Sequence, residues 1–318
     1  MSGVLFLDSL AVAAGATALS LGAGLVAAIA LAGATGRFRA LLMAVTLVNF
    51  ALPPFLVANH WLDLTASWRA TAAPGSLADG SWLLTALTLG ALLWPVPCLL
   101  VMGAWSRLQS DLLESDPAVR GVPLLAQFLI PVARPELVLS AVVVATLSLA
   151  NFTVPVLFQV RVFTEEFWIR FNTRLDATGA LRATWPLLLV PVVVLAVFRG
   201  RSIAWPRWQS SAGAGILRSQ LGVLWPVASG VTLLWMGFTV MFPLGRLVAT
   251  GRTWLELPGA ASAGMGALLN SVGTSAATAT LVVAAGLAVA ASGRRIPLRW
   301  LSWIPFLIPG VMTGVVLI

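Results

Sequence analysis

The sequence contains no lysine and no tyrosine, and it has one histidine, one cysteine and 11 acidic residues among 318. Without lysine, the chain can form neither a Walker A nucleotide-binding loop nor a Schiff base on a side chain of its own. Without a second cysteine, it can form no intrachain disulfide and no Cys-x-x-Cys metal site. We therefore predict no catalytic residues, no cofactor and no metal site.

Charge is also scarce, because charged residues make up 9% of the chain and hydrophobic residues 59%. Uncharged stretches of about twenty residues recur, and a single globular core cannot bury that much apolar surface. The sequence predicts an all-α, polytopic transmembrane helical bundle. All 19 basic residues are arginines that lie between apolar stretches, where membrane topology explains them better than nucleic acid does.

About eight membrane helices are predicted, since about twenty residues in a helix cover the hydrocarbon core. They lie at roughly 8–33, 40–61, 82–104, 136–160, 183–198, 221–245, 267–292 and 300–318. Loops after the odd-numbered helices carry 12 of the 19 arginines, so the positive-inside rule places these loops in the cytoplasm and both chain ends outside.

Two segments of the chain are similar to each other. The first predicted helix, LDSLAVAAGATALSLGAGLVAAIAL, aligns without a gap with the seventh, LLNSVGTSAATATLVVAAGLAVAAS. A Gly-Arg turn and a proline kink follow in both, in FALPPFLV and FLIPGVMT. Because the paired helices run in the same direction, the sequence predicts a parallel internal repeat.

The third and fourth predicted helices are separated by SRLQSDLLESDPAVRG at 106–121, which holds five charged residues and is followed by IPVARP and ELVLSAVVVATLSLANFTVPVLF. With the Gly-Arg turn and the proline kinks, this order of motifs resembles the inner-membrane permease subunits of binding-protein-dependent ABC importers. The likeness is greatest to the fused two-repeat permeases of the ferric iron, thiamine and polyamine group, and it covers essentially the whole chain.

The resemblance implies a MetI-like permease core in the cell inner membrane, with a first repeat at 1–200, a cytoplasmic linker at 201–220 and the start of a second repeat at 221–318. It implies a non-enzymatic subunit that forms the translocation path for ferric iron, thiamine or a polyamine. The implied partners are a cytoplasmic ABC ATPase dimer, a periplasmic substrate-binding protein and membrane lipid, with no nucleic acid.

In that family, the loop at 105–135 would form a short coupling helix that docks on the ATPase, with an E-A-A, glycine, I-x-L-P pattern. Pro131 matches the first closing proline, but without gaps Leu112 replaces the family's glutamate and Ala118 its glycine. The coupling residues implied by the resemblance are Asp111, Leu112, Glu114, Ala118, Arg120, Gly121 and Pro131. The alternative is a solvated loop whose arginines only set topology.

Amides beside proline kinks are the candidates for the translocation path, since unwound backbone and amides can line one. The candidate residues are Asn49, Pro53, Pro54, Asn151, Pro155, Pro309 and Gly310. The alternative for Asn49 and Asn151 is hydrogen bonding between helices, because a polar group in an apolar span needs a partner.

Three further segments have a structural and a functional interpretation. GAGLVA at 22–27 fits a dinucleotide-binding outline, but small residues within an apolar span favour close helix packing. His60 lacks neighbours at metal-ligand spacing, which favours an interfacial histidine. Phe163, Phe167 and Phe171 predict an amphipathic helix in the outer interface, which either receives the binding protein or caps the bundle.

An ion-coupled secondary transporter is the main alternative function. Ion coupling commonly needs an acidic residue within the membrane, and no acidic residue lies in the middle of a predicted span. An integral-membrane enzyme would need a cluster of His, Asp, Glu or Cys at one face. Pairing Pro53 with Pro309 also predicts that the second repeat is incomplete at Ile318 and continues in a longer reading frame.

Overall fold

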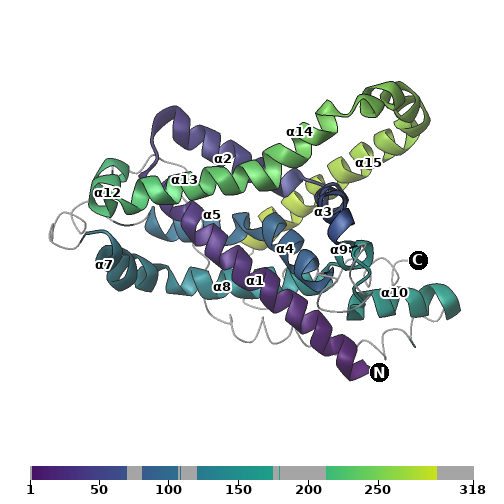
Figure 1. Ribbon diagram of the computed structural model, residues 1–318, viewed down its shortest axis with the longest axis horizontal. Coiled ribbons are helices and arrows are strands. Elements are labelled where there is room, and N and C mark those ends of the chain that lie inside the picture. Colours follow the sequence, from purple (N-terminus) through teal and green to yellow (C-terminus); the bar gives the residue numbers. More distant parts are fainter. Residues whose placement is uncertain are drawn as a thin grey trace. The chain divides into compact units, whose positions relative to one another are not determined.

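The computed structural model describes residues 2–69, 81–106, 108, 120–174, 179 and 213–291 (Figure 1). All regular secondary structure in these ranges is helical. The predicted helices at 183–198 and 300–318 lie outside the described residues, as do Pro309 and Gly310. The all-α prediction is confirmed for the part of the chain that is described.

The described residues form the following helices, given in chain order. They are α1 (Ser2–Gly33), α2 (Gly36–Ala51), α3 (Pro54–Arg69), α4 (Ser81–Leu93), α5 (Pro95–Trp105), α7 (Val122–Leu124), the π-helix η2 (Leu125–Leu129), α8 (Ile130–Ala150), α9 (Thr153–Leu157), α10 (Phe163–Arg174), α12 (Ala214–Leu221), α13 (Leu224–Met236), the π-helix η3 (Gly237–Met241), α14 (Phe242–Ala249) and α15 (Gly251–Ala291).

Among the described residues, five helical segments are long and apolar enough to cross a membrane: Val4–Gly33, Ser81–Trp105, Val122–Ala150, Leu224–Ala249 and Gly251–Ala288. They correspond to five of the eight predicted helices. A sixth predicted helix, at 40–61, is divided at Leu52, where α2 and α3 meet at 92°. Leu52 is extended because a following proline disfavours the helical conformation, so the predicted kink is a complete break.

The fourth predicted helix lies earlier in the chain than expected, and the predicted range of 136–160 is wrong at both ends. The continuous helical segment begins at Val122, after Gly121 turns the backbone with φ +63°, and it ends at Ala150. The sequence-based start followed the motif IPVARP, which was assigned to a loop, whereas the helix continues through this motif.

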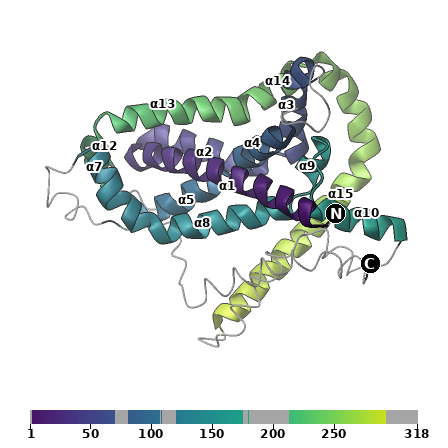
Figure 2. The same ribbon diagram turned by 60° about the horizontal axis from the view of Figure 1, so that its bottom comes forward.

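The described helices form two compact units, with residues up to Pro243 in the larger unit and Leu244–Ala291 in the smaller. In the larger unit, α1 is central and packs against α4, α5, α8, α12 and α13. Figure 2 shows α1 running between α13 and α8. The helices α12 and α13 therefore pack on α1, although the sequence places them in the linker and the second repeat.

Small residues set the distance between α1 and its neighbours. A Cβ on Gly24 would lie 2.5 Å from Pro97 Cγ and 2.7 Å from the Trp94 carbonyl oxygen. Gly15 also packs closely, near Ala86. Because the contacts of Gly15 and Gly24 occur in the same order along α4–α5 as along α1, the two segments run in the same direction. This contact confirms the close-packing interpretation of GAGLVA, and the position of the segment within α1 rules out a strand-turn-helix nucleotide site there.

In the smaller unit, α15 is 41 residues long and contains the whole range Gly251–Ala288 that could cross a membrane. Its described side chains are almost all exposed, including Leu255, Val272 and Leu281. An apolar helix that exposes all of its faces to water is unfavourable, so α15 requires lipid or further protein around it.

Candidate functional site

The coupling and path residues predicted from the sequence fall into two groups in the larger unit. At one end, the C-terminus of α1 meets the start of α13, where Trp225 Nε1 donates a hydrogen bond of 3.1 Å to the Ala30 carbonyl. The ring of Phe38, at the start of α2, lies edge-on to Trp225 at 6.3 Å. We call this the arginine end, because Arg37, Arg39, Arg120 and Arg218 lie on the helix ends and turns gathered there.

Of the predicted coupling residues, Arg120, Gly121 and Pro131 lie at the arginine end, where Arg120 and Pro131 are exposed. The Gly121 N–H donates to the Gln220 carbonyl at 2.8 Å and joins the start of α7 to α12. Gly121 has a positive φ, which a residue with a Cβ rarely adopts. Asp111, Leu112, Glu114 and Ala118 lie outside the described residues.

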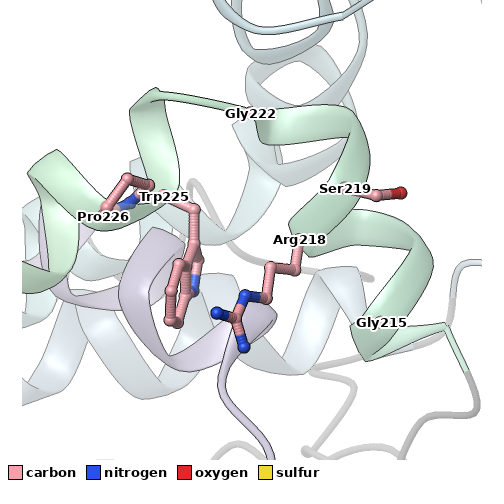
Figure 3. A pocket seen from close by; sticks show the side chains of 6 residues that line it. All are labelled: Gly215, Arg218, Ser219, Gly222, Trp225 and Pro226. Atoms are coloured by element: carbon pink, nitrogen blue, oxygen red, sulfur yellow. The ribbon is translucent and has the colours of Figure 1, made fainter.

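A pocket of about 390 Å³ opens beside α12 and the start of α13 (Figure 3). Gly215, Arg218, Ser219, Gly222, Trp225 and Pro226 line it. The Arg218 guanidinium carbon lies 3.9 Å from the centre of the Trp225 ring, a cation–π contact, while the Ser219 hydroxyl points away. The sequence analysis missed this pair, whose only signal is the spacing in LRSQLGVLWP.

Away from the arginine end, the divided α2–α3 helix meets the short helix that follows α8, since α9 packs against both α3 and α4. Asn49, one turn before the break at Leu52, is 1% exposed. Its Nδ2 donates to the Leu92 carbonyl at 2.9 Å, and its Oδ1 has no hydrogen-bond partner among the described residues. Pro53 and Pro54 form the break itself.

Asn151 lies at the second interruption, directly after α8. Its Oδ1 accepts a hydrogen bond of 3.0 Å from the Val154 N–H and so caps α9, which contains the buried Pro155. The Thr164 hydroxyl donates to the Leu149 carbonyl at 2.9 Å and occupies one of the last carbonyls of α8. Asn151 is thus a local cap, whereas Asn49 joins two helices.

The predicted amphipathic helix is present as α10. Phe163 and Phe167 are buried, and the Phe163 N–H donates to Ser9 Oγ of α1 at 2.9 Å. The opposite side carries the exposed ion pair between Arg170 and Glu166, at 2.7 Å. The phenylalanine face therefore packs on protein, which favours the capping interpretation of this helix over the binding-protein interpretation.

Glu136 is a second residue that the sequence analysis missed. It lies midway along Val122–Ala150, so the statement that no acidic residue lies in the middle of a span is wrong for this segment. The side chain is half-buried, and its Oε2 has no hydrogen-bond partner among the described residues. The sequence could have indicated Glu136 only with the correct start of this helical segment.

His60 belongs to an aromatic cluster. Its ring lies 4.9 Å from Phe242 and 5.7 Å from Trp61, and Trp61 lies 4.4 Å from Phe238. The described ranges contain no group of three His, Cys, Asp or Glu side chains that could hold a metal ion. The ring of His60 is buried among aromatic side chains.

Comparisons with protein-family models, with curated proteins and with solved structures give no match for this chain.

Proposed function

We propose that the chain is the transmembrane permease subunit of an ABC importer, which forms a translocation path that a separate ATPase drives. The observation that carries the proposal is the packing of α9, the short helix that follows the break at Asn151, against α3 of the divided α2–α3 helix and against α4. Interrupted helices supply backbone groups and amides to a substrate path, which continuous apolar helices cannot do. Asn49, with a buried unpaired oxygen, is the first candidate for contact with substrate.

The charged segment at 106–121 is the proposed contact with the ATPase. It follows α5 and returns to the bundle at Gly121, which is hydrogen-bonded to α12 at the arginine end. In this proposal the arginine end faces the cytoplasm of a cell whose inner membrane holds the chain. A periplasmic binding protein would deliver ferric iron, thiamine or a polyamine to the opposite end.

Glu136 favours a second candidate, an ion-coupled secondary transporter. A half-buried carboxylate with an unpaired oxygen, inside a segment that could cross the membrane, is the kind of group that proton or sodium coupling uses. The two candidates differ in their energy source, which makes them separable by experiment.

The deciding experiment purifies the tagged chain from its native membranes and measures ATP hydrolysis in the eluate. Because the chain has no lysine, it has no Walker A loop, so hydrolysis must come from a bound partner. We expect hydrolysis with the wild-type chain and a loss of most of it in the triple variant Asp111→Asn, Glu114→Gln, Arg120→Gln. Substitutions of charged loop residues away from the packed core usually change folding little, so this variant should still insert.

A matched control neutralises three charges of α10 instead: Glu165→Gln, Glu166→Gln and Arg170→Gln. We expect this variant to keep its ATPase. If the wild-type chain carries no ATPase, or if both triple variants lose it equally, the ABC proposal is wrong. The secondary-transport candidate then requires that Glu136→Gln abolish uptake that a protonophore also abolishes.

A further inference from the structure

The pocket at the start of α13 has features that transport does not require. Arg218 extends from an exposed face of α12, and its guanidinium lies against Trp225 (Figure 3). Within the described part of the chain, no carboxylate forms an ion pair with Arg218. A cation–π contact uses the face of the guanidinium and leaves its N–H groups free to donate to an anion.

The pocket lies at the start of α13, and the exposed side chains that follow along this helix are apolar. Val223, directly before α13, is 78% exposed, and on α13 Leu234 is 76% exposed, with Val227 and Val231 also exposed. The helix belongs to Leu224–Ala249, one of the segments that could cross a membrane. An exposed apolar surface on such a segment is covered by lipid acyl chains.

Small residues continue from the pocket along α13. Gly222 lies in the turn before α13, and Pro226 and Gly230 form a row on the helix because they are four residues apart. All three are exposed, and a Cβ on either glycine would meet no atom within 4 Å. The row is therefore open and bordered by exposed aliphatic side chains, as a bound acyl chain would need.

We propose that this pocket binds the phosphate of an anionic phospholipid, with its acyl chain along α13. Arg218 donates to the phosphate oxygens, and the open surface of α13 at Pro226 and Gly230 holds the chain. A tryptophan and an arginine at the end of a membrane helix lie at the depth of the headgroups, which is the level of a lipid phosphate. The proposal requires that the chain spans a membrane, but it does not require the proposed transport function.

A free phosphate has the same headgroup chemistry but no acyl chain. The apolar row would then contribute nothing, and an exposed arginine alone binds phosphate weakly in water. We therefore assign the pocket to a lipid and use inorganic phosphate as a competitor in the test.

The test adds lipids to the delipidated full-length chain in detergent and counts bound lipids by native mass spectrometry. Phosphatidylglycerol should bind more tightly than phosphatidylcholine, whose headgroup has no net charge. Arg218→Gln should weaken phosphatidylglycerol binding about fivefold, the value of one arginine near an anionic surface. Arg134→Gln, which removes another exposed arginine outside the pocket, should leave the binding unchanged.

Three outcomes would overturn the proposal. These are equal binding of the two lipids, an equal loss in Arg218→Gln and Arg134→Gln, and displacement of the lipid by an equal concentration of inorganic phosphate. Arg218→Lys covers the case in which Arg218→Gln fails to fold. Lysine keeps the charge, so this variant should still prefer phosphatidylglycerol, and a loss of that preference would also contradict the site.

Discussion

The contact between α1 and α5 at Gly24 gives the sharpest stability prediction. In Gly24→Ala, the new Cβ would lie 2.5 Å from Pro97 Cγ, 2.7 Å from the Trp94 carbonyl oxygen and 3.0 Å from the Cys98 amide nitrogen. Two of these three atoms belong to the backbone and cannot turn away as a flexible side chain would. The substitution must therefore move α1 away from α5.

The expected destabilisation combines two opposing terms. Overpacking of a tight contact costs about 1–3 kcal/mol. Replacing glycine by alanine inside a helix returns up to about 1 kcal/mol, because alanine is the better helix former. The net destabilisation is about 1–2 kcal/mol, which multiplies the population of the opened state by roughly 5–30.

The single cysteine provides the assay, since Cys98 is buried at this same contact with 0% exposure. A fluorogenic maleimide in mild detergent reports each opening that exposes the thiol, so Gly24→Ala should raise the labelling rate roughly 5- to 30-fold. Gly22→Ala is the matched control, because Gly22 lies on the same helix and a Cβ there would meet nothing within 4 Å.

We expect Gly22→Ala to label at the wild-type rate or more slowly, since only the helix-propensity term remains. Equal labelling rates in Gly24→Ala and the wild type would refute the packing argument. Equal acceleration in both alanine variants would show that any new methyl group on α1 is harmful, and the distances at Gly24 would then explain nothing.

Two further predictions follow from the ends of the larger unit. In a Cys98→Ala background, a cysteine at Asn172 should react with a membrane-impermeant thiol reagent in intact cells, whereas one at Ser219 should not, because the proposed topology places the arginine end in the cytoplasm. The reverse pattern would invert this topology. Asn49→Leu should destabilise the chain by about 1–2 kcal/mol in detergent, measured by chemical denaturation, because the hydrogen bond to Leu92 is lost. An unchanged midpoint would show that this bond contributes nothing.

Most of the helices could be predicted from the sequence. A run of about twenty apolar residues must satisfy its backbone hydrogen bonds internally in a membrane, and the α-helix is the structure in which a single segment does so. That argument needs no knowledge of neighbours, and it gave the approximate positions of α1, α4–α5, α13–α14 and α15. The same argument gave the wrong start for the helix that contains α8, because amino-acid composition does not reveal a turn such as the one at Gly121.

The candidate sites were less predictable because they depend on which helices meet. The sequence selected Asn49 and Asn151 for the same reason, yet one joins α2 to α4 and the other caps α9. Neither Arg218 nor Trp225 was predicted as a site residue, since their contact depends on the turn at Gly222, where φ is +54°. Glu136 was discounted because of a helix boundary, not because of its chemistry.

By itself, the amino-acid sequence determined that this chain is helical and rich in segments that suit a membrane, because hydropathy and backbone hydrogen bonding act locally. It also located the proline break after Asn49, which a proline imposes on the residue before it. Only the tertiary structure decided that α1 is the central helix, that α12 and α13 pack on it, and that Arg218 meets Trp225. Those outcomes depend on the fit between surfaces far apart in the chain, where the absence of a Cβ at Gly24 counts as much as any side chain present.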